Sequence, residues 1–191
     1  MRVLLIGAPG AGKGTQAVRI ATDFGITHIS SGDLLREHVA RESAIGRAAK
    51  EYISRGDLVP DAVVMDMLRK PVVAANASGG YVLDGFPRTV EQAEAAYLTA
   101  KDLGVAVQVA VQLDVARDQL VQRLLARGRG ADDTAEVIEH RLEIFEKHTM
   151  PMLDYYAERE KLVIVNGERG MDEVTWSIRV QLQRVAKSLS A

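Results

Sequence analysis

The chain has 191 residues and a formal net charge of −2, with hydrophobic and charged fractions of 47% and 26%. These are ordinary values for one folded domain. The small net charge provides no global field that would recruit nucleic acid or an anionic membrane, and no apolar run is long enough to span a bilayer. The absence of cysteine excludes disulfides and cysteine-based zinc sites, and it fits a reducing compartment.

Short apolar runs alternate with longer helical patterns, which is typical of βαβ units around a parallel sheet. The predicted strands are Arg2–Ile6, Thr27–Ile29, Tyr81–Leu83, Val105–Leu113 and Leu162–Val165. The predicted helices are Lys13–Phe24, Gly32–Arg41, Ile45–Arg55, Asp61–Leu68, Val90–Leu103, Ala116–Arg127, Thr134–Ala157 and Met171–Leu189. Pro71 is expected to end or kink the helix that begins at Asp61. The surplus between the second and third strands, residues 30–59, predicts a small helical insertion.

The most informative motif is the glycine-rich segment GAPGAGKGT at residues 7–15, directly after the first predicted strand. A strand, such a loop and a helix start make a cradle for nucleotide phosphates, because backbone N–H groups at a helix N-terminus attract anions. Gly10, Gly12 and Gly14 permit a close approach of the backbone, and Lys13 supplies a positive charge. The generic motif has Ser or Thr directly after the lysine, whereas here Gly14 precedes Thr15. The alternative, a plain glycine-rich turn, is disfavoured by the spacing, the lysine and the preceding strand. Because this loop begins at Gly7, we expect no cleaved signal peptide.

Asp84 comes directly after the third predicted strand. An acidic residue at the carboxyl end of a buried strand beside a phosphate loop commonly holds the water shell of Mg²⁺. The alternative is an aspartate that caps a turn or a helix. The phosphate loop favours the metal interpretation.

Two further side chains follow Asp84 in sequence. Arg88 is expected at the carboxyl edge of the sheet, where α/β folds bind ligands and where a guanidinium suits a phosphate. Gln92 has two interpretations. It completes a capping box with Thr89, or its amide reads a purine edge; local sequence favours the cap.

Arginines elsewhere also have two interpretations each. Ser31 is a predicted N-cap, and Arg36 lies just over one turn later, so local rules favour an ordinary capped helix with a solvated arginine. Arg123 and Arg127 are four residues apart on one predicted helix face, which makes sense if an anion lies between these like charges. Arg129 and Arg141 follow, and an exposed arginine- and glycine-rich loop explains this group equally well. The four histidines have no metal-binding spacing, and we interpret them as structural or solvated.

These motifs, in this order and spacing from Met1 to about Gly167, resemble those of the adenylate kinase family. The resemblance implies an α/β fold of the P-loop NTPase type, with three layers, a five-stranded parallel sheet, a helical AMP-binding insertion and a short lid. It implies the reversible reaction ATP + AMP = 2 ADP by direct in-line transfer, with Mg²⁺ bound to ATP.

The resemblance also implies roles for individual residues. It assigns ATP binding to Gly10, Ala11, Gly12, Lys13, Gly14, Thr15, Arg123, Arg127 and Gly167. It assigns AMP binding to Ser31, Gly32, Arg36, Asp57, Leu58, Val59, Gly85, Phe86, Pro87, Arg88, Gln92, Arg129 and Arg141. The implied catalytic residues are Lys13, Arg88, Arg127, Arg129 and Arg141. Thr15 and Asp84 are expected to hold Mg²⁺ through water.

The implied organisation is one domain over residues 1–191. Its core comprises residues 1–29, 60–126 and 134–191, its AMP-binding insertion residues 30–59, and its lid about residues 127–133. The lid has neither the length nor the cysteines of zinc-binding lids, so no zinc is expected. Gly130 and Ala131 separate Arg129 from Asp132, where the family usually has one residue. We expect a cytoplasmic monomer whose partners are ATP, AMP and ADP, with no nucleic acid or membrane partner.

Two rival functions fit parts of the pattern. UMP/CMP kinases share the phosphate loop and the GFPR segment at residues 85–88, but usually have Ala at the position of Ser31 and Asn at that of Gln92. A sensor that binds adenylates without turnover would be expected to lack the lysine or the lid arginines. This sequence retains the lysine and the lid arginines.

Overall fold

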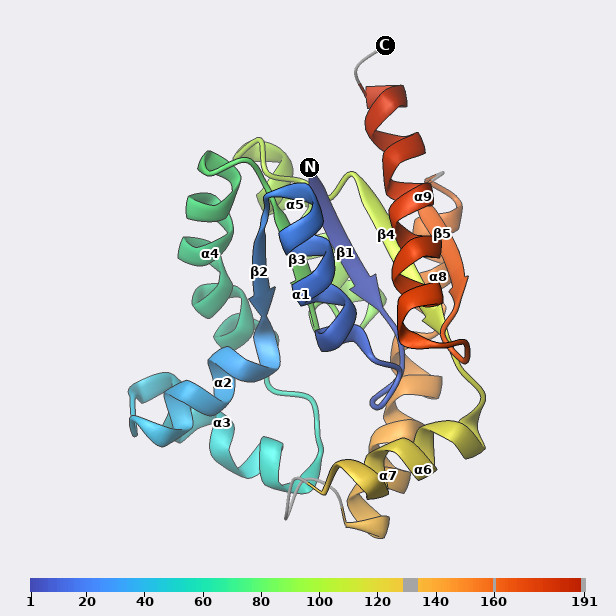
Figure 1. Cartoon of the computed structure of the whole chain (residues 1–191). Coiled ribbons are helices and arrows are strands. Elements are labelled where there is room, and N and C mark those ends of the chain that lie inside the picture. Colours follow the sequence, from blue (N-terminus) through green and yellow to red (C-terminus); the bar gives the residue numbers. More distant parts are fainter. Residues whose placement is uncertain (129–133, 160, 190–191) are drawn as a thin grey trace.

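The computed structural model describes residues 1–128, 134–159 and 161–189, and it shows a central sheet with helices on both faces (Figure 1). The strands are β1 (Arg2–Ile6), β2 (Thr27–Ser30), β3 (Tyr81–Asp84), β4 (Val109–Asp114) and β5 (Leu162–Asn166). Their order is β2-β3-β1-β4-β5, and every neighbouring pair is parallel. The predicted five-stranded parallel sheet is therefore confirmed.

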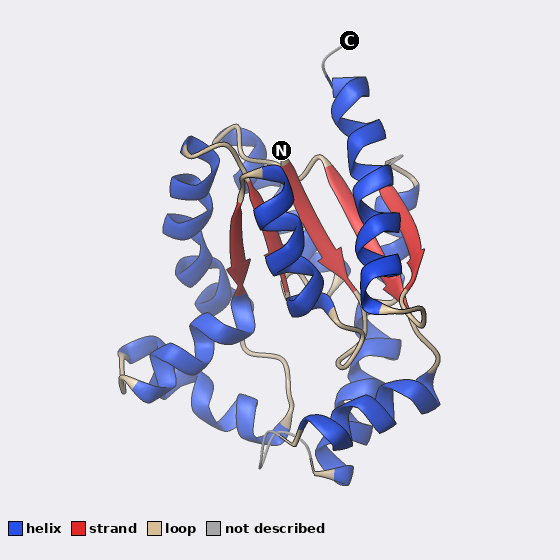
Figure 2. Cartoon of the chain, viewed as in Figure 1, coloured by secondary structure: helices blue, strands red, loops and turns tan. Residues whose placement is uncertain are grey.

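Helices connect the strands and cover the sheet (Figure 2). They are α1 (Lys13–Phe24), α2 (Ser31–Ala40), α3 (Ala44–Arg55), α4 (Asp61–Ala77), α5 (Val90–Asp102), α6 (Arg117–Arg127), α7 (Ala135–Ile144), α8 (Pro151–Ala157) and α9 (Met171–Leu189). A π-helical segment, Phe145–Thr149, joins α7 to α8. Helices α2 and α3 pack against each other within residues 30–59, below the end of β2 in Figure 1.

Alternate side chains of β1 enter two separate apolar cores, because successive strand residues point to opposite faces of a sheet. Val3 and Leu5 pack in the core that includes buried residues of α1, α6, α7 and α9. Leu4 and Ile6 pack in the core that includes buried residues of α4, α5 and α8. All four are nearly inaccessible to solvent, so β1 reads as a continuous apolar run. This arrangement is the expected three-layer architecture.

The predicted end of the helix that begins at Asp61, at Leu68 before Pro71, is wrong. Helix α4 continues through this proline to Ala77. A proline inside a helix removes one backbone hydrogen bond, at a cost of about 3 kcal/mol. The same helix buries Val64, Met67, Leu68 and Ala75 on both sides of the proline. Burying each large apolar side chain contributes about 1.5–3 kcal/mol, so packing outweighs the local defect.

Two other boundaries differ from prediction. The fourth strand begins at Val109 rather than Val105. Val105 lies in the loop before the strand, where its carbonyl oxygen accepts a hydrogen bond from the Tyr81 hydroxyl at 2.6 Å. The predicted helix over residues 134–157 is interrupted by the π-helical segment and restarts at Pro151. A proline suits the first turn of a helix, because it lacks the N–H that would otherwise be unsatisfied there. Within the described part of the chain, no helix has the length and apolar character needed to cross a membrane.

Candidate active site

The phosphate loop lies between β1 and α1, at the carboxyl edge of the sheet. Gly10 and Gly12 have φ angles of 86° and 93°, a backbone conformation that favours glycine. A Cβ at Gly10 would also lie 2.9 Å from the Leu124 Cγ, so α6 packs directly on the loop. Gly14, by contrast, is helical and has room for a Cβ, 3.7 Å from the Asp84 Oδ2. The first two glycines therefore shape the loop, and the third brings α1 close to Asp84.

Lys13 is held against the loop that precedes it. Its Nζ donates hydrogen bonds to the carbonyl oxygens of Gly7 and Ala8, at 2.8 and 3.0 Å. Burial lowers the pKa of Lys13 to about 8, Asp84 opposes this shift, and the positive charges of Arg88, Arg141 and Arg127 add to it. Four cationic groups thus influence one another near the loop. This is the electrostatic arrangement that a polyphosphate would neutralise.

Asp84 ends β3, next to the phosphate loop in space because β3 pairs with β1. Its side chain is buried, whereas Thr15 in the first turn of α1 is exposed. A carboxylate and a hydroxyl are oxygen donors of the kind that Mg²⁺ uses together with phosphates and water. Among the residues that the structure describes, no group of three or more histidines, cysteines, aspartates and glutamates is placed to hold a metal by itself.

A second pocket opens beside the loop, between α2, α4 and the segment after β3. Its lining residues are Ser31, Leu35, Leu58, Val59, Val64, Gly85, Phe86, Arg88 and Gln92. Most of these are predicted AMP-binding residues, while Leu35 and Val64 were missed because apolar residues on helices read as core. The structure thus gathers predicted residues from three distant segments of the chain.

Ser31 is not the N-cap of α2, contrary to prediction. The Ser30 hydroxyl caps this helix by accepting from the Asp33 N–H at 3.2 Å. The Ser31 side chain is instead buried in the pocket, with 1% of the residue exposed. Its Oγ has no hydrogen-bond partner. A buried hydroxyl without a partner costs free energy, so it indicates a place where a bound ligand supplies the partner.

Arg88 lines this pocket, and Arg36 lies near enough for its charge to act on Arg88. The Arg88 Nε donates to the Gly85 carbonyl oxygen at 2.7 Å, and the Thr149 hydroxyl donates to the Arg88 carbonyl oxygen at 2.8 Å. Burial lowers the pKa of Arg88, Asp84 raises it, and nearby Arg36 lowers it further. Arg36 also forms an ion pair with Asp33 on α2. Thr149, which sequence reasoning missed, lies in the π-helical segment and supports the backbone of Arg88.

The capping box predicted for Gln92 is only half formed. The Thr89 hydroxyl accepts from the Gln92 N–H at 3.1 Å, as expected. The Gln92 amide oxygen, however, accepts from the N–H of Arg88 rather than that of Thr89. Its amide nitrogen donates to the Asp61 Oδ1 at 2.6 Å. The side chain is therefore directed into the pocket between two partners, and Asp61 is a further site residue that sequence reasoning missed.

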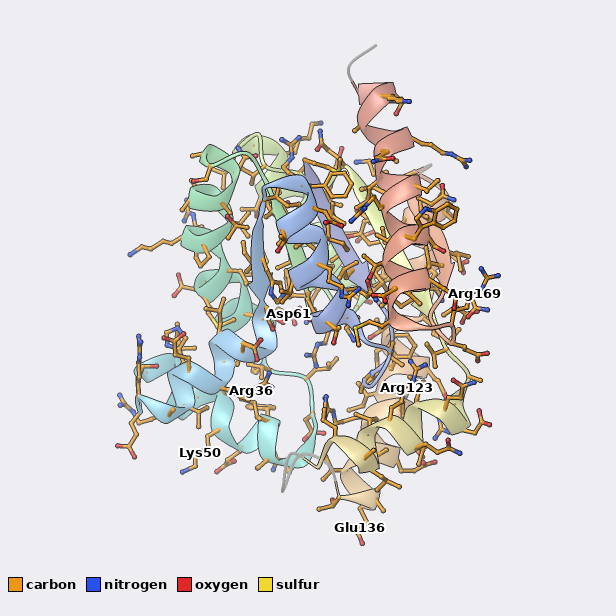
Figure 3. All side chains as sticks on the ribbon, viewed as in Figure 1. Arg36, Lys50, Asp61, Arg123, Glu136 and Arg169 are labelled. Carbon is orange, nitrogen blue, oxygen red and sulfur yellow. The ribbon has the colours of Figure 1, made fainter. Side chains whose placement is uncertain are left out.

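The predicted ATP side of the site lies on α6 and after β5. Both terminal nitrogens of Arg123 donate to the Gly167 carbonyl oxygen at 3.1 Å. Arg127 ends α6 and lies close enough to influence Lys13. In the view of Figure 3, Arg123 on α6 and Arg36 on α2 lie on opposite sides of the region below the strand ends. Arg129 and most of the predicted lid, about residues 127–133, lie outside the described residues.

Helix α7 meets the segment 56–58 across the site. The Arg141 side chain packs on Gly56, where a Cβ would be 2.8 Å from the Arg141 Cγ. The Asp57 Oδ1 lies 2.7 Å from the His140 Nε2. This hydrogen bond is the largest cause that lowers the pKa of Asp57. The Asp57 side chain is thus engaged with α7 and Arg55, while Leu58 and Val59 line the pocket.

A glycine phosphate loop, a partly buried lysine and converging arginines on a parallel α/β sheet define a P-loop phosphotransferase. Comparisons with known proteins narrow this class. A family model described as adenylate kinase matches residues 5–161. The chain is 44% identical over 181 residues to adenylate kinase 1 of a Nostoc species, covering 95% of this chain and 98% of that protein.

Two further relatives agree with this match. Identity is 40% over 190 residues to adenylate kinase of Trichodesmium erythraeum, covering 97% and 99% of the two chains. It is 44% over 174 residues to adenylate kinase of Rhodococcus erythropolis, covering 91% and 94%. The chain belongs to the adenylate kinase family. It is a nucleoside monophosphate kinase, and its reaction is ATP + AMP = 2 ADP.

Proposed function

We propose that the chain performs this reaction by direct in-line transfer between two nucleotides bound at the carboxyl edge of its sheet. Residues 10–15, with Arg123, Arg127 and the Gly167 carbonyl, hold ATP. The pocket that contains Ser31, together with Gly32, Arg36, Asp57 and Pro87, holds AMP. An oxygen of the AMP phosphate is already anionic, so it attacks the γ-phosphorus of ATP without a strong general base. The β,γ bridging oxygen departs with the bond electrons, which leaves two ADP molecules.

The observation that carries this proposal is the convergence of cations between the loop and the pocket. Lys13, Gly85, Arg88 and Arg141 line a single cavity, together with Gly7 and Gly56. Charge spread over the transferring oxygens is stabilised by such fixed cations, and loss of one typically costs about 10²–10³ in rate. We assign this role to Lys13, Arg88, Arg127 and Arg141. We extend it to Arg129 from the family resemblance alone.

The residues near the loop fit a Mg²⁺ ion carried by ATP. The buried Asp84 carboxylate faces the first turn of α1, and both it and the Thr15 hydroxyl offer oxygen. Mg²⁺ keeps most of its waters and takes one or two carboxylates plus phosphate oxygens. When bound, the ion offsets negative charge on the ATP phosphates. The chain's own contribution is the oriented Asp84 carboxylate, and it offers no zinc-binding cysteines.

We further propose that two segments move around this core. The insertion of residues 30–59 closes over AMP, and the lid of about residues 127–133 closes over ATP and excludes water, which would otherwise hydrolyse ATP. We propose that the enzyme is a cytoplasmic monomer that acts in adenine nucleotide metabolism. Its partners are then the three adenine nucleotides, with no nucleic acid or membrane partner.

A nucleotide panel tests the proposal. Purified protein is assayed for diphosphate formation with ATP, Mg²⁺ and either AMP, UMP or CMP. We expect a strong preference for AMP. A preference for UMP or CMP would show a pyrimidine kinase, and calorimetric binding of adenylates without ADP formation would show a sensor. The retained lysine and the matches above favour turnover with AMP.

A further inference from the structure

The Gln92 side-chain amide is held at both ends inside the pocket. Only 3% of Gln92 is exposed. Its oxygen accepts from the Arg88 backbone N–H at 2.7 Å, and its nitrogen donates to the Asp61 Oδ1 at 2.6 Å. A backbone N–H can only donate and a carboxylate can only accept. The two partners therefore fix which end of the amide is oxygen and which is nitrogen.

This fixed orientation has a consequence for base recognition. An amide has two N–H donors and two oxygen lone pairs, so one of each remains for a ligand. The Watson–Crick edge of adenine offers an acceptor at N1 and a donor at the 6-amino group, which this remaining pair matches. A 6-oxopurine offers the reverse, a donor at N1–H and an acceptor at O6. It would require the amide to rotate by 180°, against both partners.

We propose that Asp61 is a positioning residue that sets the selectivity for a 6-aminopurine over a 6-oxopurine monophosphate. The inference rests on the proposed role of this pocket as the AMP site. Asp61 starts α4, two residues after Val59 and three before Val64, which both line the pocket. Its carboxylate reaches Gln92 across 31 residues of sequence. In a flipped amide, oxygen would face the Asp61 carboxylate and the NH₂ group would face the Arg88 N–H.

The carboxylate also has an ordinary structural explanation. An acidic residue in the first turn of a helix interacts favourably with the helix dipole, and α4 has no side-chain cap at Pro60. Such a role affects stability alone. It predicts no change in the ratio of activities toward two purines, so that ratio separates the two explanations.

The test compares kcat and KM for AMP and for IMP, with ATP and Mg²⁺ held saturating. In Asp61→Ala, KM for AMP should rise, kcat at saturating AMP should change little, and the ratio of kcat/KM for IMP to that for AMP should rise about tenfold to a hundredfold, as for losing a charged hydrogen-bond acceptor. Asp61→Asn keeps an oxygen acceptor, so it should restore the ratio to near that of the wild type. Asp66→Ala, on the exposed side of the same helix, should match the wild type.

A second measurement does not depend on turnover. In nucleotide-free protein labelled with nitrogen-15, the Gln92 side-chain NH₂ protons should exchange slowly with water, and Asp61→Ala should accelerate this exchange. Asp61→Leu serves if the alanine variant does not fold. The inference would be overturned if the ratio of kcat/KM for IMP to that for AMP were unchanged in Asp61→Ala and Asp61→Leu. It would also be overturned if Asp61→Asn and Asp61→Ala changed this ratio equally. A wild-type protein that does not phosphorylate AMP would instead overturn the proposed function.

Discussion

The depressed pKa of Lys13 predicts how ATP binding depends on pH. Burial and three nearby arginines lower this pKa to about 8 in the nucleotide-free protein. Only the protonated amine attracts phosphate, so bound ATP raises the pKa and affinity must fall as pH rises through 8. The charged fraction is about 0.9 at pH 7, about 0.5 at pH 8 and about 0.1 at pH 9. The dissociation constant should therefore rise about tenfold from pH 7 to pH 9, which is about 1.4 kcal/mol.

The assay is isothermal titration calorimetry with ATP at several pH values between 7 and 9, where the terminal phosphate is already largely ionised. Lys13→Met is the matched perturbation, since it retains the length of the side chain and removes the charge. It should bind ATP more weakly, show no tenfold trend, and lose about 10²–10³ in kcat. A wild-type affinity that stays constant over this range, or an equal trend in Lys13→Met, would refute the reasoning. Near-normal turnover of Lys13→Met would remove the catalytic role.

Three other substitutions have distinct expected outcomes. Gly85 has a φ of +85°, and Gly85→Ala places a Cβ 2.6 Å from the Ser31 Oγ in the pocket, so AMP affinity measured by calorimetry should fall at least tenfold. The control Gly104→Ala has a similar φ of +68° but open space around its Cβ, and it should bind AMP normally. His140→Ala should raise the pKa of Asp57 toward its ordinary value in a carbon-13 NMR titration, and an unchanged pKa would contradict the assigned hydrogen bond. Leu182→Ala, fully buried beneath the sheet, should lower the free energy of unfolding in urea by about 2–5 kcal/mol; a loss below about 1 kcal/mol would show a core that readjusts.

Local patterns predicted the fold where the relevant physics is local. The continuous apolar run of β1 and the glycine signals around residues 7–14 depend on residues close together in sequence, and both elements appear as expected. The end of α4 could not be read in this way. Its continuation past Pro71 depends on apolar contacts with β2, β3 and α3, which no local rule weighs against the missing hydrogen bond. The predicted boundary was wrong because tertiary packing outweighed local propensity.

In the site, too, local motifs could be predicted from the sequence, whereas features that depend on tertiary contacts could not. The phosphate loop is one contiguous motif, so its sequence alone indicated an anion. The pocket depends on residues that come together only in the folded chain. The exchange of roles between Ser30 and Ser31 illustrates the limit, because adjacent serines are equivalent to a capping rule and only one hydroxyl turns inward. Asp61 reads as an ordinary acid at a helix start until its contact with Gln92 is seen.

The positive charges gathered around Lys13 also affect the thermal stability of the protein. The charges of Arg88, Arg127 and Arg141 act on Lys13. Like charges held together raise the free energy of the folded state, and a bound polyanion offsets this repulsion. Resistance to heat should therefore depend on occupancy, growing by about 2.7 kcal/mol when a tightly bound polyphosphate is present at a hundred times its dissociation constant. The protein without bound nucleotide is then less stable than the complex. The same guanidinium and ammonium groups thus determine both catalysis and thermal stability.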